Sequence, residues 1–327
     1  MLPRNVLAIR KALGTATEIL ISTTPKSSQA MLLDYPSGSY TGMRTVNRIG
    51  ILDFSVHTTR LANSLRQIQF PGATAQEEQA VAAGLASLRQ DEVMKKETTN
   101  LVRTGLLHYY KQLKQDLPGN TGGTAAGGDD VKVTVLCTWD PEKQQPVLAA
   151  HFEPLKSPST PHCKVEVHGS PRKQATAKNS QWVRDRSAIL ASMSKDSNEA
   201  LLVDDATQDV YEGLSSNFFV LHRKRQSIIT APLGSVLEGT IMRSVIRVCK
   251  EKSIPVEYSF PNLKHIDEWE GAFLSSMSRL VLPIEKLILP GGRIKQFESS
   301  PTIESIRDSV EKECQNRVEN LLSESDL

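Results

Sequence analysis

The segment from Tyr211 to Leu221, YEGLSSNFFVL, places a glutamate where chemistry is possible. Glu212 is followed by a glycine and small polar residues, and then by an apolar run that predicts a buried strand. Buried strands do not normally open with a glutamate. Two interpretations remain open from this segment alone: a carboxylate directed at a ligand, or a hairpin tip on which Glu212 is solvated.

This segment resembles the E-G-x-x-x-N-[aromatic or aliphatic] signature of fold-type IV pyridoxal-phosphate enzymes. The group includes branched-chain aminotransferases, D-amino-acid aminotransferases and aminodeoxychorismate lyases. In that family the glutamate faces the pyridine nitrogen of the cofactor. A carboxylate in this place keeps the nitrogen protonated, which strengthens the ring as an electron sink. The resemblance implies this role for Glu212.

The family also has a lysine on an earlier strand, and Lys178 in ATAKNSQW precedes Glu212 by 34 residues, a similar separation. The resemblance implies that Lys178 forms a Schiff base with the cofactor. Once the substrate displaces it, the amine would move a proton between the α-carbon and C4′. Burial and cofactor charge would favour the required loss of its proton. The rival Lys173 follows Arg172 in a Pro-flanked loop, where we expect a solvated charge.

Two further stretches resemble phosphate-binding elements of the family. VHTTRLANSL resembles its H-x-x-R-L element, which implies that Arg60 binds the phosphate through its planar guanidinium. An exposed helix arginine is the alternative. VLEGTIMRSVI resembles a turn in which backbone N–H groups at a helix start receive the phosphate, which implies Gly239, Thr240 and Ile241. This turn has one more residue than usual before Arg243.

A third stretch, AFLSSMSRLVLPI, resembles a strand-turn-strand element that gives the phosphate a hydroxyl, often from the threonine of S-[GS]-T. Alignment from Pro283 puts Met277 in the place of that threonine. A thioether cannot donate a hydrogen bond, so Ser276 or Ser278 would replace it, or the bond would be lost. The loss of one neutral hydrogen bond costs on the order of 1 kcal/mol.

In the first half of the chain, GSYTGMR (38–44) resembles a segment that lines the substrate site of the family. The resemblance implies that Tyr40 and Arg44 contact the amino or keto acid, with Arg44 binding a carboxylate. A purely structural strand is the alternative. The run HRKR (222–225) lies between two expected strands, so a solvated hairpin turn is expected there.

Helices and strands must position these residues, and the sequence predicts several of them. Apolar residues at helical spacing predict a helix from Phe54 to about Ile68. A longer helical region, broken once, is predicted from Gln76 to about Leu113, because this stretch is rich in Ala, Leu, Glu, Gln and Lys and lacks both Pro and a Gly cluster. The segment 118–130 is predicted to be a flexible loop; no GK[ST] follows its glycines, which argues against a nucleotide loop. VKVTVLCTW (131–139) and PVLAAHF (146–152) are predicted to be paired strands.

A Pro/Ser-rich stretch, 153–162, predicts a linker between an N-terminal domain (1–152) and a C-terminal domain (163–327). The second domain contains one clear helix, from about Thr240 to Lys252. The tail SESDL is expected to be disordered. The strand signals of this domain lie in KVEVH, ALLVD, SNFFVLH, SIITA and AFLSS.

Composition limits the class of protein. With 39 basic against 37 acidic residues, no basic field indicates nucleic acid as a partner. No apolar run approaches the roughly 20 residues that span a bilayer, so a soluble protein is expected. The basic N-terminus, MLPRNVLAIRKALGTATEIL, fits a mitochondrial or plastid targeting helix, an ordinary first helix or a frayed end; otherwise we expect a cytoplasmic protein. Reduced thiols and no metal site are expected from four distant cysteines, Cys137, Cys163, Cys249 and Cys314.

The sequence therefore predicts an α+β chain of two domains, of which the second is β-rich; the resemblance implies an N-terminal α/β sandwich and a C-terminal β-rich pseudo-barrel. The resemblance implies a fold-type IV enzyme with pyridoxal 5′-phosphate between the domains, and a homodimer. It implies transfer of an amino group between an amino acid of the branched-chain or D type and a 2-oxo acid. An aminodeoxychorismate lyase and a relative that has lost catalysis, suggested by Met277 and the altered turn, are the alternatives.

Overall fold

The computed structural model describes residues 5–13, 16–72, 74–116, 130–158 and 160–327, so the expected loop at 118–130 lies almost wholly outside the described residues. The chain divides into two compact units, which are described one at a time. The first change of unit falls inside the predicted linker, but two later segments return to the first unit. Unit 1 holds Met1–Lys156, Ala177–Arg184 and Arg317–Leu327; unit 2 holds Ser157–Thr176 and Asp185–Asn316.

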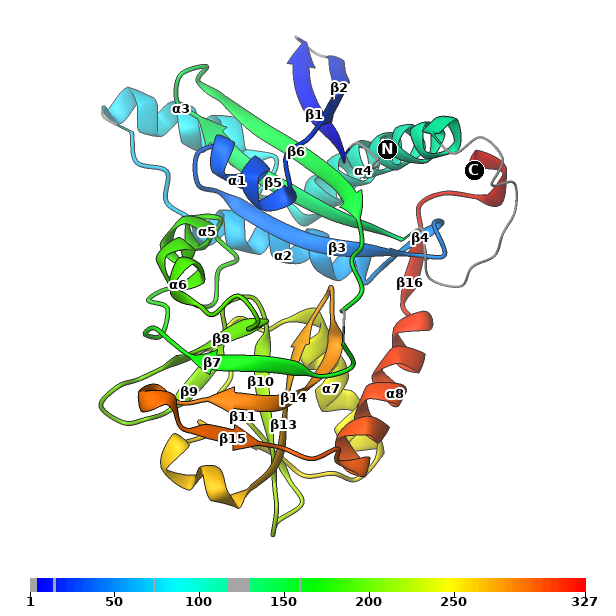
Figure 1. The fold of residues 1–327 in the computed structure, drawn as a ribbon. Helices are drawn as coiled ribbons and strands as arrows, with labels where there is room; N and C mark the ends of the chain where they lie inside the picture. Colours follow the sequence, from blue (N-terminus) through cyan, green and yellow to red (C-terminus); the bar gives the residue numbers. More distant parts are fainter. Residues whose placement is uncertain (1–4, 14–15, 73, 117–129, 159) are drawn as a thin grey trace. The chain divides into compact units, whose positions relative to one another are not determined.

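Unit 1 is built on a seven-stranded sheet in the order β16-β4-β3-β5-β6-β1-β2 (Figure 1). The predicted pair of strands is confirmed, since β5 and β6 run antiparallel over ten residue pairs. The strands are β1 (Asn5–Leu13), β2 (Ala16–Thr24), β3 (Ser39–Val46), β4 (Gly50–Leu52), β5 (Val131–Asp140), β6 (Gln145–Pro154) and β16 (Val318–Asn320).

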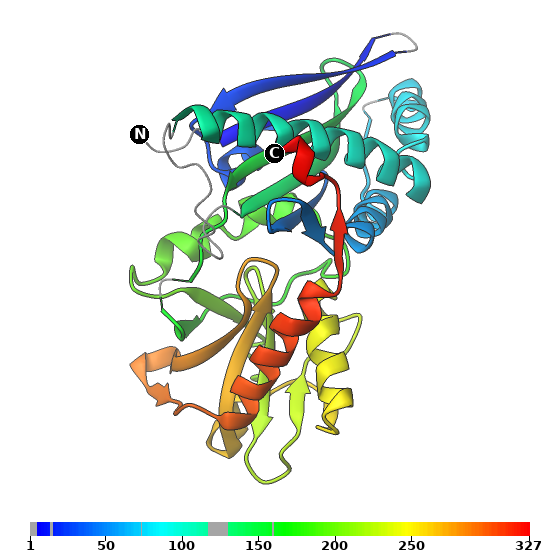
Figure 2. The ribbon, with the colours of Figure 1, turned by 90° about the vertical axis from the view of Figure 1, so that its right-hand side faces the viewer.

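Helices cover both faces of this sheet, which makes unit 1 a sandwich. Along β5, Val133 and Val135 pack into the core formed with α2, α3 and α4, whereas Leu136 packs on the other face against α1. Figure 2 shows α4 running across the sheet. Both predicted helical regions are confirmed, including the single break. The helices are α1 (Ser28–Asp34), α2 (Phe54–Gln67), α3 (Ala75–Ala86) and α4 (Asp91–Asp116).

Unit 2 is a closed, barrel-like sheet. The strands β10, β13, β14, β7, β8 and β9 follow one another, and the pairing of Asn217 with Glu212 joins β9 back to β10. Strands β11, β12 and β15 extend this ring (Figure 1). The strands are β7 (Cys163–Val167), β8 (Glu199–Val203), β9 (Val210–Gly213), β10 (Asn217–His222), β11 (Ile228–Thr230), β12 (Val256–Tyr258), β13 (Trp269–Ser276), β14 (Leu280–Ile288) and β15 (Ile294–Gln296).

The predicted helix near Thr240 is confirmed as α7 (Thr240–Glu251), which packs against β13 and α8 (Pro301–Gln315). Its buried side chains recur at helical spacing, as expected for a helix that covers a sheet. The remaining elements are short: α5 (Gln181–Asp185), α6 (Ser187–Ser192), and the 3-10 helices η1 (Leu263–Glu268), η2 (Pro290–Gly292) and η3 (Glu324–Asp326).

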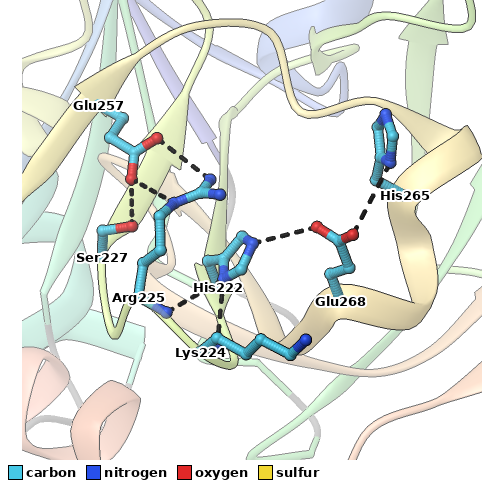
Figure 3. Close-up of polar contacts among 7 residues, drawn as sticks. All are labelled: His222, Lys224, Arg225, Ser227, Glu257, His265 and Glu268. Atoms are coloured by element: carbon cyan, nitrogen blue, oxygen red, sulfur yellow. Dashed lines mark hydrogen bonds and ion pairs between the residues drawn. The ribbon is translucent and has the colours of Figure 1, made fainter.

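The run HRKR forms the predicted hairpin turn between β10 and β11, but its histidine is buried rather than solvated. His222 Nδ1 accepts the backbone N–H groups of Lys224 and Arg225, each at 3.2 Å (Figure 3). The proton of the ring therefore sits on Nε2, 3.1 Å from an oxygen of Glu268. The Arg225 guanidinium binds Glu257 at 2.9 and 3.1 Å, which holds the turn to β12.

The N-terminal segment is not helical over residues 5–13 and 16–24, so the helix expected there is wrong, whereas organelle targeting stays a prediction. These residues form β1 and β2, and β1 also pairs with β6. Val6 and Ala8 are completely buried while their neighbours are not, which is the period of two that a half-buried strand requires. Arg10 of β1, one of the basic residues that suggested targeting, binds Glu97 of α4.

The tail is also ordered, contrary to expectation. Strand β16 pairs with β4, and Leu322 behind it is buried in the core of unit 1. Ser323 and Asp326 form a capping box at η3, and Arg103 of α4 binds the Asp326 carboxylate at 2.9 Å. The composition of the tail does not reveal its contacts with Arg103, because Arg103 lies more than 200 positions earlier in the chain.

Replacing Leu322 with alanine should lower the free energy of unfolding by about 2–4 kcal/mol, because the side chain is buried in a packed core. Urea unfolding followed by circular dichroism measures this change. The control is Leu33→Ala, since Leu33 is exposed; its expected change is below about 0.5 kcal/mol. Equal effects of the two substitutions would show that the tail does not contribute to the core.

All four cysteines are buried thiols. Burial raises the pKa of the Cys137, Cys163 and Cys249 thiols to about 12, so these thiols stay protonated at neutral pH. Among the described helices, none combines the length and apolar character needed to cross a membrane. Within the same part of the chain, no three His, Cys, Asp or Glu side chains are placed to hold a metal ion.

Candidate active site

Lys178 lies in unit 1 and not in a regular strand, in contrast to the strand implied by the resemblance; only an isolated bridge joins its neighbour Asn179 to Ser39. Its backbone is nevertheless held on both sides. The Tyr40 N–H donates to the Lys178 carbonyl at 3.0 Å, and the Lys178 N–H donates to Ser64 Oγ at 3.1 Å. Lys178 Nζ lies 4.8 Å from the centre of the Tyr40 ring, within the range of a cation–π contact. Strand β3 and helix α2 thus fix the position of the Lys178 backbone.

Arg60 projects from α2 toward β3 in the same unit. Its Nη2 donates to Thr41 Oγ1 at 2.8 Å and to His57 Nδ1 at 3.0 Å. Because Nδ1 accepts this bond, the neutral His57 ring carries its proton on Nε2. Burial, the dominant cause, and the positive charges of Arg60, Lys178 and Arg317 hold the pKa of His57 well below its usual value of 6.5. The His57 ring therefore stays neutral near these positively charged side chains.

The depressed pKa of His57 predicts how stability depends on pH. The native state leaves this ring unprotonated, whereas the unfolded state binds a proton below pH 6.5, so the stabilisation is present above pH 6.5 and is lost as pH falls. Relative to His57→Gln, the wild type should lose up to about 2 kcal/mol of unfolding free energy between pH 6.5 and 5. Urea titrations across this range measure the difference. An unchanged difference between the two proteins across this range would contradict the prediction.

Tyr40 and Arg44, the two predicted substrate contacts, lie on one face of β3, because side chains alternate along a strand. Both are half-buried. Tyr40 packs at the edge of a small apolar cluster, which places hydrocarbon next to the Lys178 amine. The buried members of this cluster are Met31, Leu32, Leu136 and Val183.

Glu212 lies in unit 2, at the end of β9, and is buried, so the alternative of a solvated hairpin tip is wrong. Its Oε1 accepts from Arg172 Nε at 2.8 Å and Nη2 at 2.5 Å, and the Leu237 N–H approaches Oε2 at 3.4 Å. No local pattern in the sequence points to Arg172, which lies 40 residues away. A partner of this kind is suggested only by the general rule that a buried carboxylate needs a cation nearby. Lys173, next to it, is exposed, as expected.

The start of α7 has the features of an anion site. Gly239 caps the helix and no side chain caps its first turn, where the N–H groups of Thr240 and Ile241 have no partners within the helix. A Cβ at Gly239 would lie 2.4 Å from Asn217 Oδ1, so a larger residue would have to displace the Asn217 side chain. Asn217 Nδ2 in turn donates to the Leu237 carbonyl at 2.7 Å, which fixes the approach of this turn to β10.

Two hydroxyl groups at the end of β13 are suited to bind the same anion as the start of α7. Ser275 pairs across the sheet with Asn217, the residue that contacts Gly239. Among the described residues, Ser275 Oγ and Ser276 Oγ are buried without a hydrogen-bond partner. Buried hydroxyls normally have one, so these two are suited to a phosphate oxygen. Ser276 was predicted from the sequence, but Ser275 was not.

Met277 and Ser278 follow in the turn after β13 and are half-buried. The thioether that stands in place of a threonine therefore has serine hydroxyls immediately before it. The residues present thus fit a phosphate without a contribution from Met277, and its substitution does not argue against cofactor binding.

The predicted site residues fall into two groups by unit. Unit 1 brings Lys178, Tyr40 and the Arg60–His57–Thr41 cluster together around β3 and α2. Unit 2 brings Glu212, Asn217, Gly239 and Ser275 together where β9, β10, β13 and α7 meet. The first group holds an amine and an arginine, and the second holds a paired carboxylate and an anion cradle.

Comparison with known proteins places these features in a family. The model of the family described as amino-transferase class IV matches residues 38–287, which include every predicted site residue. No curated protein matches the sequence.

Solved structures share the fold over nearly the whole chain. A branched-chain aminotransferase from Thermoproteus uzoniensis, solved with norvaline, has a TM-score of 0.66 at 16% identity and covers 92% of this chain and 97% of its own. A fold IV-transaminase from Curtobacterium pusillum has a TM-score of 0.67 at 15% identity, with 95% and 99% covered. A putative branched-chain amino acid aminotransferase from Thermotoga maritima has a TM-score of 0.61 at 19% identity, with 95% and 96% covered.

Proposed function

Because the chain belongs to the class IV aminotransferase family, whose enzymes use pyridoxal phosphate, we propose that it moves an amino group between an apolar amino acid of the branched-chain type and a 2-oxo acid, with Lys178 as the cofactor-binding lysine. The family membership gives the enzyme class and the cofactor. The identity of the lysine and the choice of substrate belong to the proposal.

One observation carries the choice of substrate. The Lys178 amine lies 4.8 Å above the Tyr40 ring, and that ring packs on the apolar cluster of Met31, Leu32, Leu136 and Val183. A hydrocarbon side chain placed beside the amine would contact surface that is already apolar, whereas a charged one would be desolvated there. Arg44, on the same face of β3, is the candidate partner of the substrate carboxylate.

In the proposed reaction, different side chains of this protein have different roles. When bound, pyridoxal phosphate supplies an electrophilic carbonyl carbon and an electron sink. Lys178 would bind it covalently and would carry the proton removed from the substrate's α-carbon. Glu212, paired with Arg172, would favour the protonated form of the ring nitrogen. The amides at the start of α7, Ser275 and Ser276 would hold the phosphate, with Arg60 as the proposed further ligand.

A substrate panel tests the proposal. The purified protein with added cofactor should convert 2-oxoglutarate to glutamate with leucine, isoleucine or valine as donor, and kcat/KM for leucine should exceed that for aspartate at least tenfold. D-leucine and D-alanine test the stereochemistry. Pyruvate release from aminodeoxychorismate, without amino transfer to any 2-oxo acid, would replace the proposed reaction by a lyase reaction.

We further propose that the active protein is a homodimer, as the family resemblance implies. Light scattering during size-exclusion chromatography should give twice the chain mass of 36.1 kDa. A monomer with full activity would contradict this proposal without affecting the proposed reaction.

A further inference from the structure

Three hydrogen bonds converge on one carboxylate oxygen in unit 2. Glu199, the first residue of β8, is buried, and its Oε2 accepts from Ser215 Oγ at 2.8 Å and Ser216 Oγ at 3.1 Å. The third donor is Arg279, whose Nη1 lies 2.7 Å from the same oxygen. Nη2 of this arginine donates to the Asn198 carbonyl at 3.1 Å, so the guanidinium is fixed at two points.

These donors come from two separate turns, and each turn borders a candidate cofactor contact. Ser215 and Ser216 lie between Glu212, at the end of β9, and Asn217, at the start of β10. Arg279 closes the turn that begins after Ser276. The Glu199 carboxylate is therefore a common anchor for the Glu212–Asn217 turn and the Ser276–Arg279 turn.

The packing around this anchor leaves little room for movement. A Cβ at Gly213 would lie 2.5 Å from Ser216 Oγ and 3.1 Å from Glu199 Cγ, so the first turn lies directly against the glutamate. The Glu199 side chain is only 3% exposed, whereas that of Arg279 is 24% exposed. A charge-assisted bond in such a place holds its partners more firmly than a solvated one.

We propose that Glu199 and Arg279 are positioning residues for the cofactor phosphate, which they serve by locking together the two turns that border Ser276 and Asn217. The proposal rests on the proposed function, since it takes the phosphate of pyridoxal phosphate as the ligand. In this proposal neither residue is itself a ligand of that phosphate. Without the anchor, the Ser276 hydroxyl and the Gly239 turn, which Asn217 supports, lose their fixed spacing.

Glu166 offers a matched control in the same unit. It lies on β7, next to β8, and is also buried; it accepts the Ser194 N–H at 3.1 Å and Ser197 Oγ at 2.5 Å. It thus anchors a turn in the same way, but that turn carries none of the predicted cofactor residues. Any general cost of removing a buried carboxylate from this sheet should appear in both variants.

The test compares two forms of the cofactor on the full-length protein. The Kd values of pyridoxal phosphate and of pyridoxal, which lacks the phosphate, are measured by quenching of tryptophan fluorescence. Glu199→Gln should raise the Kd of pyridoxal phosphate about tenfold, the equivalent of about 1.4 kcal/mol, and change that of pyridoxal less than about twofold. Glu166→Gln should change neither. Inorganic phosphate should raise the melting temperature of cofactor-free wild type and Glu166→Gln, but not of Glu199→Gln.

Arg279→Lys provides a second route if Glu199→Gln does not fold. It retains the charge but loses one of the two anchoring bonds, so a smaller rise in the Kd of pyridoxal phosphate, about threefold, is expected, with pyridoxal unchanged. Equal losses for both cofactor forms, or no loss in either variant, would overturn the positioning role. A wild type that binds no pyridoxal phosphate would overturn the proposed function instead.

Discussion

Lys178→Ala should lower the rate of transamination by about a thousandfold or more, because it removes both the covalent attachment point and the group that carries the proton. The backbone contacts of Lys178 with Tyr40 and Ser64 do not need its side chain, so the variant should fold normally. Steady-state kinetics with leucine and 2-oxoglutarate measure the loss. Circular dichroism checks the fold.

Borohydride reduction identifies the lysine directly. Treatment of the wild type with cofactor and borohydride should leave the pyridoxyl group on the peptide that contains Lys178, as seen by mass spectrometry. Lys173→Ala is the matched control, since Lys173 lies nearby in the sequence but is exposed, and this variant should be labelled and active like the wild type. Labelling at Lys173, or transamination by Lys178→Ala, would refute the assignment.

Arg172→Met should lower the free energy of unfolding by about 3–5 kcal/mol, because it leaves the Glu212 carboxylate buried without its cation. The side chains of this pair are only 9% and 5% exposed, so solvent screens the interaction little. Denaturant unfolding of the cofactor-free protein measures the effect. Activity should fall as well, because Glu212 is no longer held in one place.

A surface ion pair gives the comparison for this variant. Arg307 binds Glu304 at 2.6 Å within α8, but both side chains are about one quarter exposed. Arg307→Met should therefore cost less than about 1 kcal/mol. If Arg172→Met costs no more than this control, Glu212 is stabilised by groups other than Arg172. The double variant Arg172→Met/Glu212→Gln should recover part of the lost stability, since it leaves no buried charge unpaired.

Elements with a strong local pattern could be predicted from the sequence. Helix α2 follows from its apolar periodicity, the α3–α4 pair from its composition, and the β5–β6 hairpin from two apolar runs around a polar turn. The N-terminal strands were missed because the basic residues of β1 suggested a different use for this segment. The order of the C-terminal tail was missed because it depends on β4 and α4.

The residues of the candidate site also divide into those that a sequence pattern identifies and those that it does not. Glu212, Gly239 and Ser276 stand in motifs whose residues are neighbours in sequence, so a family pattern could identify them. Arg172 and Glu199 lie outside these motifs, and Ser275 and Arg279 lie inside the AFLSSMSRLVLPI stretch at positions to which the family pattern assigns no role. Their roles arise from contacts across strands of the closed sheet, and the spacing of these contacts is set by the register between strands rather than by distance along the chain.

The edge strand β16 constrains the order in which this protein can assemble during synthesis. Its residues are synthesised late, yet they pair with β4, whose residues are synthesised early. All residues of unit 2 lie between these two strands in the sequence, so they are synthesised before the pairing can form. A nascent or prematurely terminated chain therefore presents β4 with an open edge, a template for pairing with other chains. Ribosome stalling or a late stop codon should thus yield aggregation rather than a shortened enzyme.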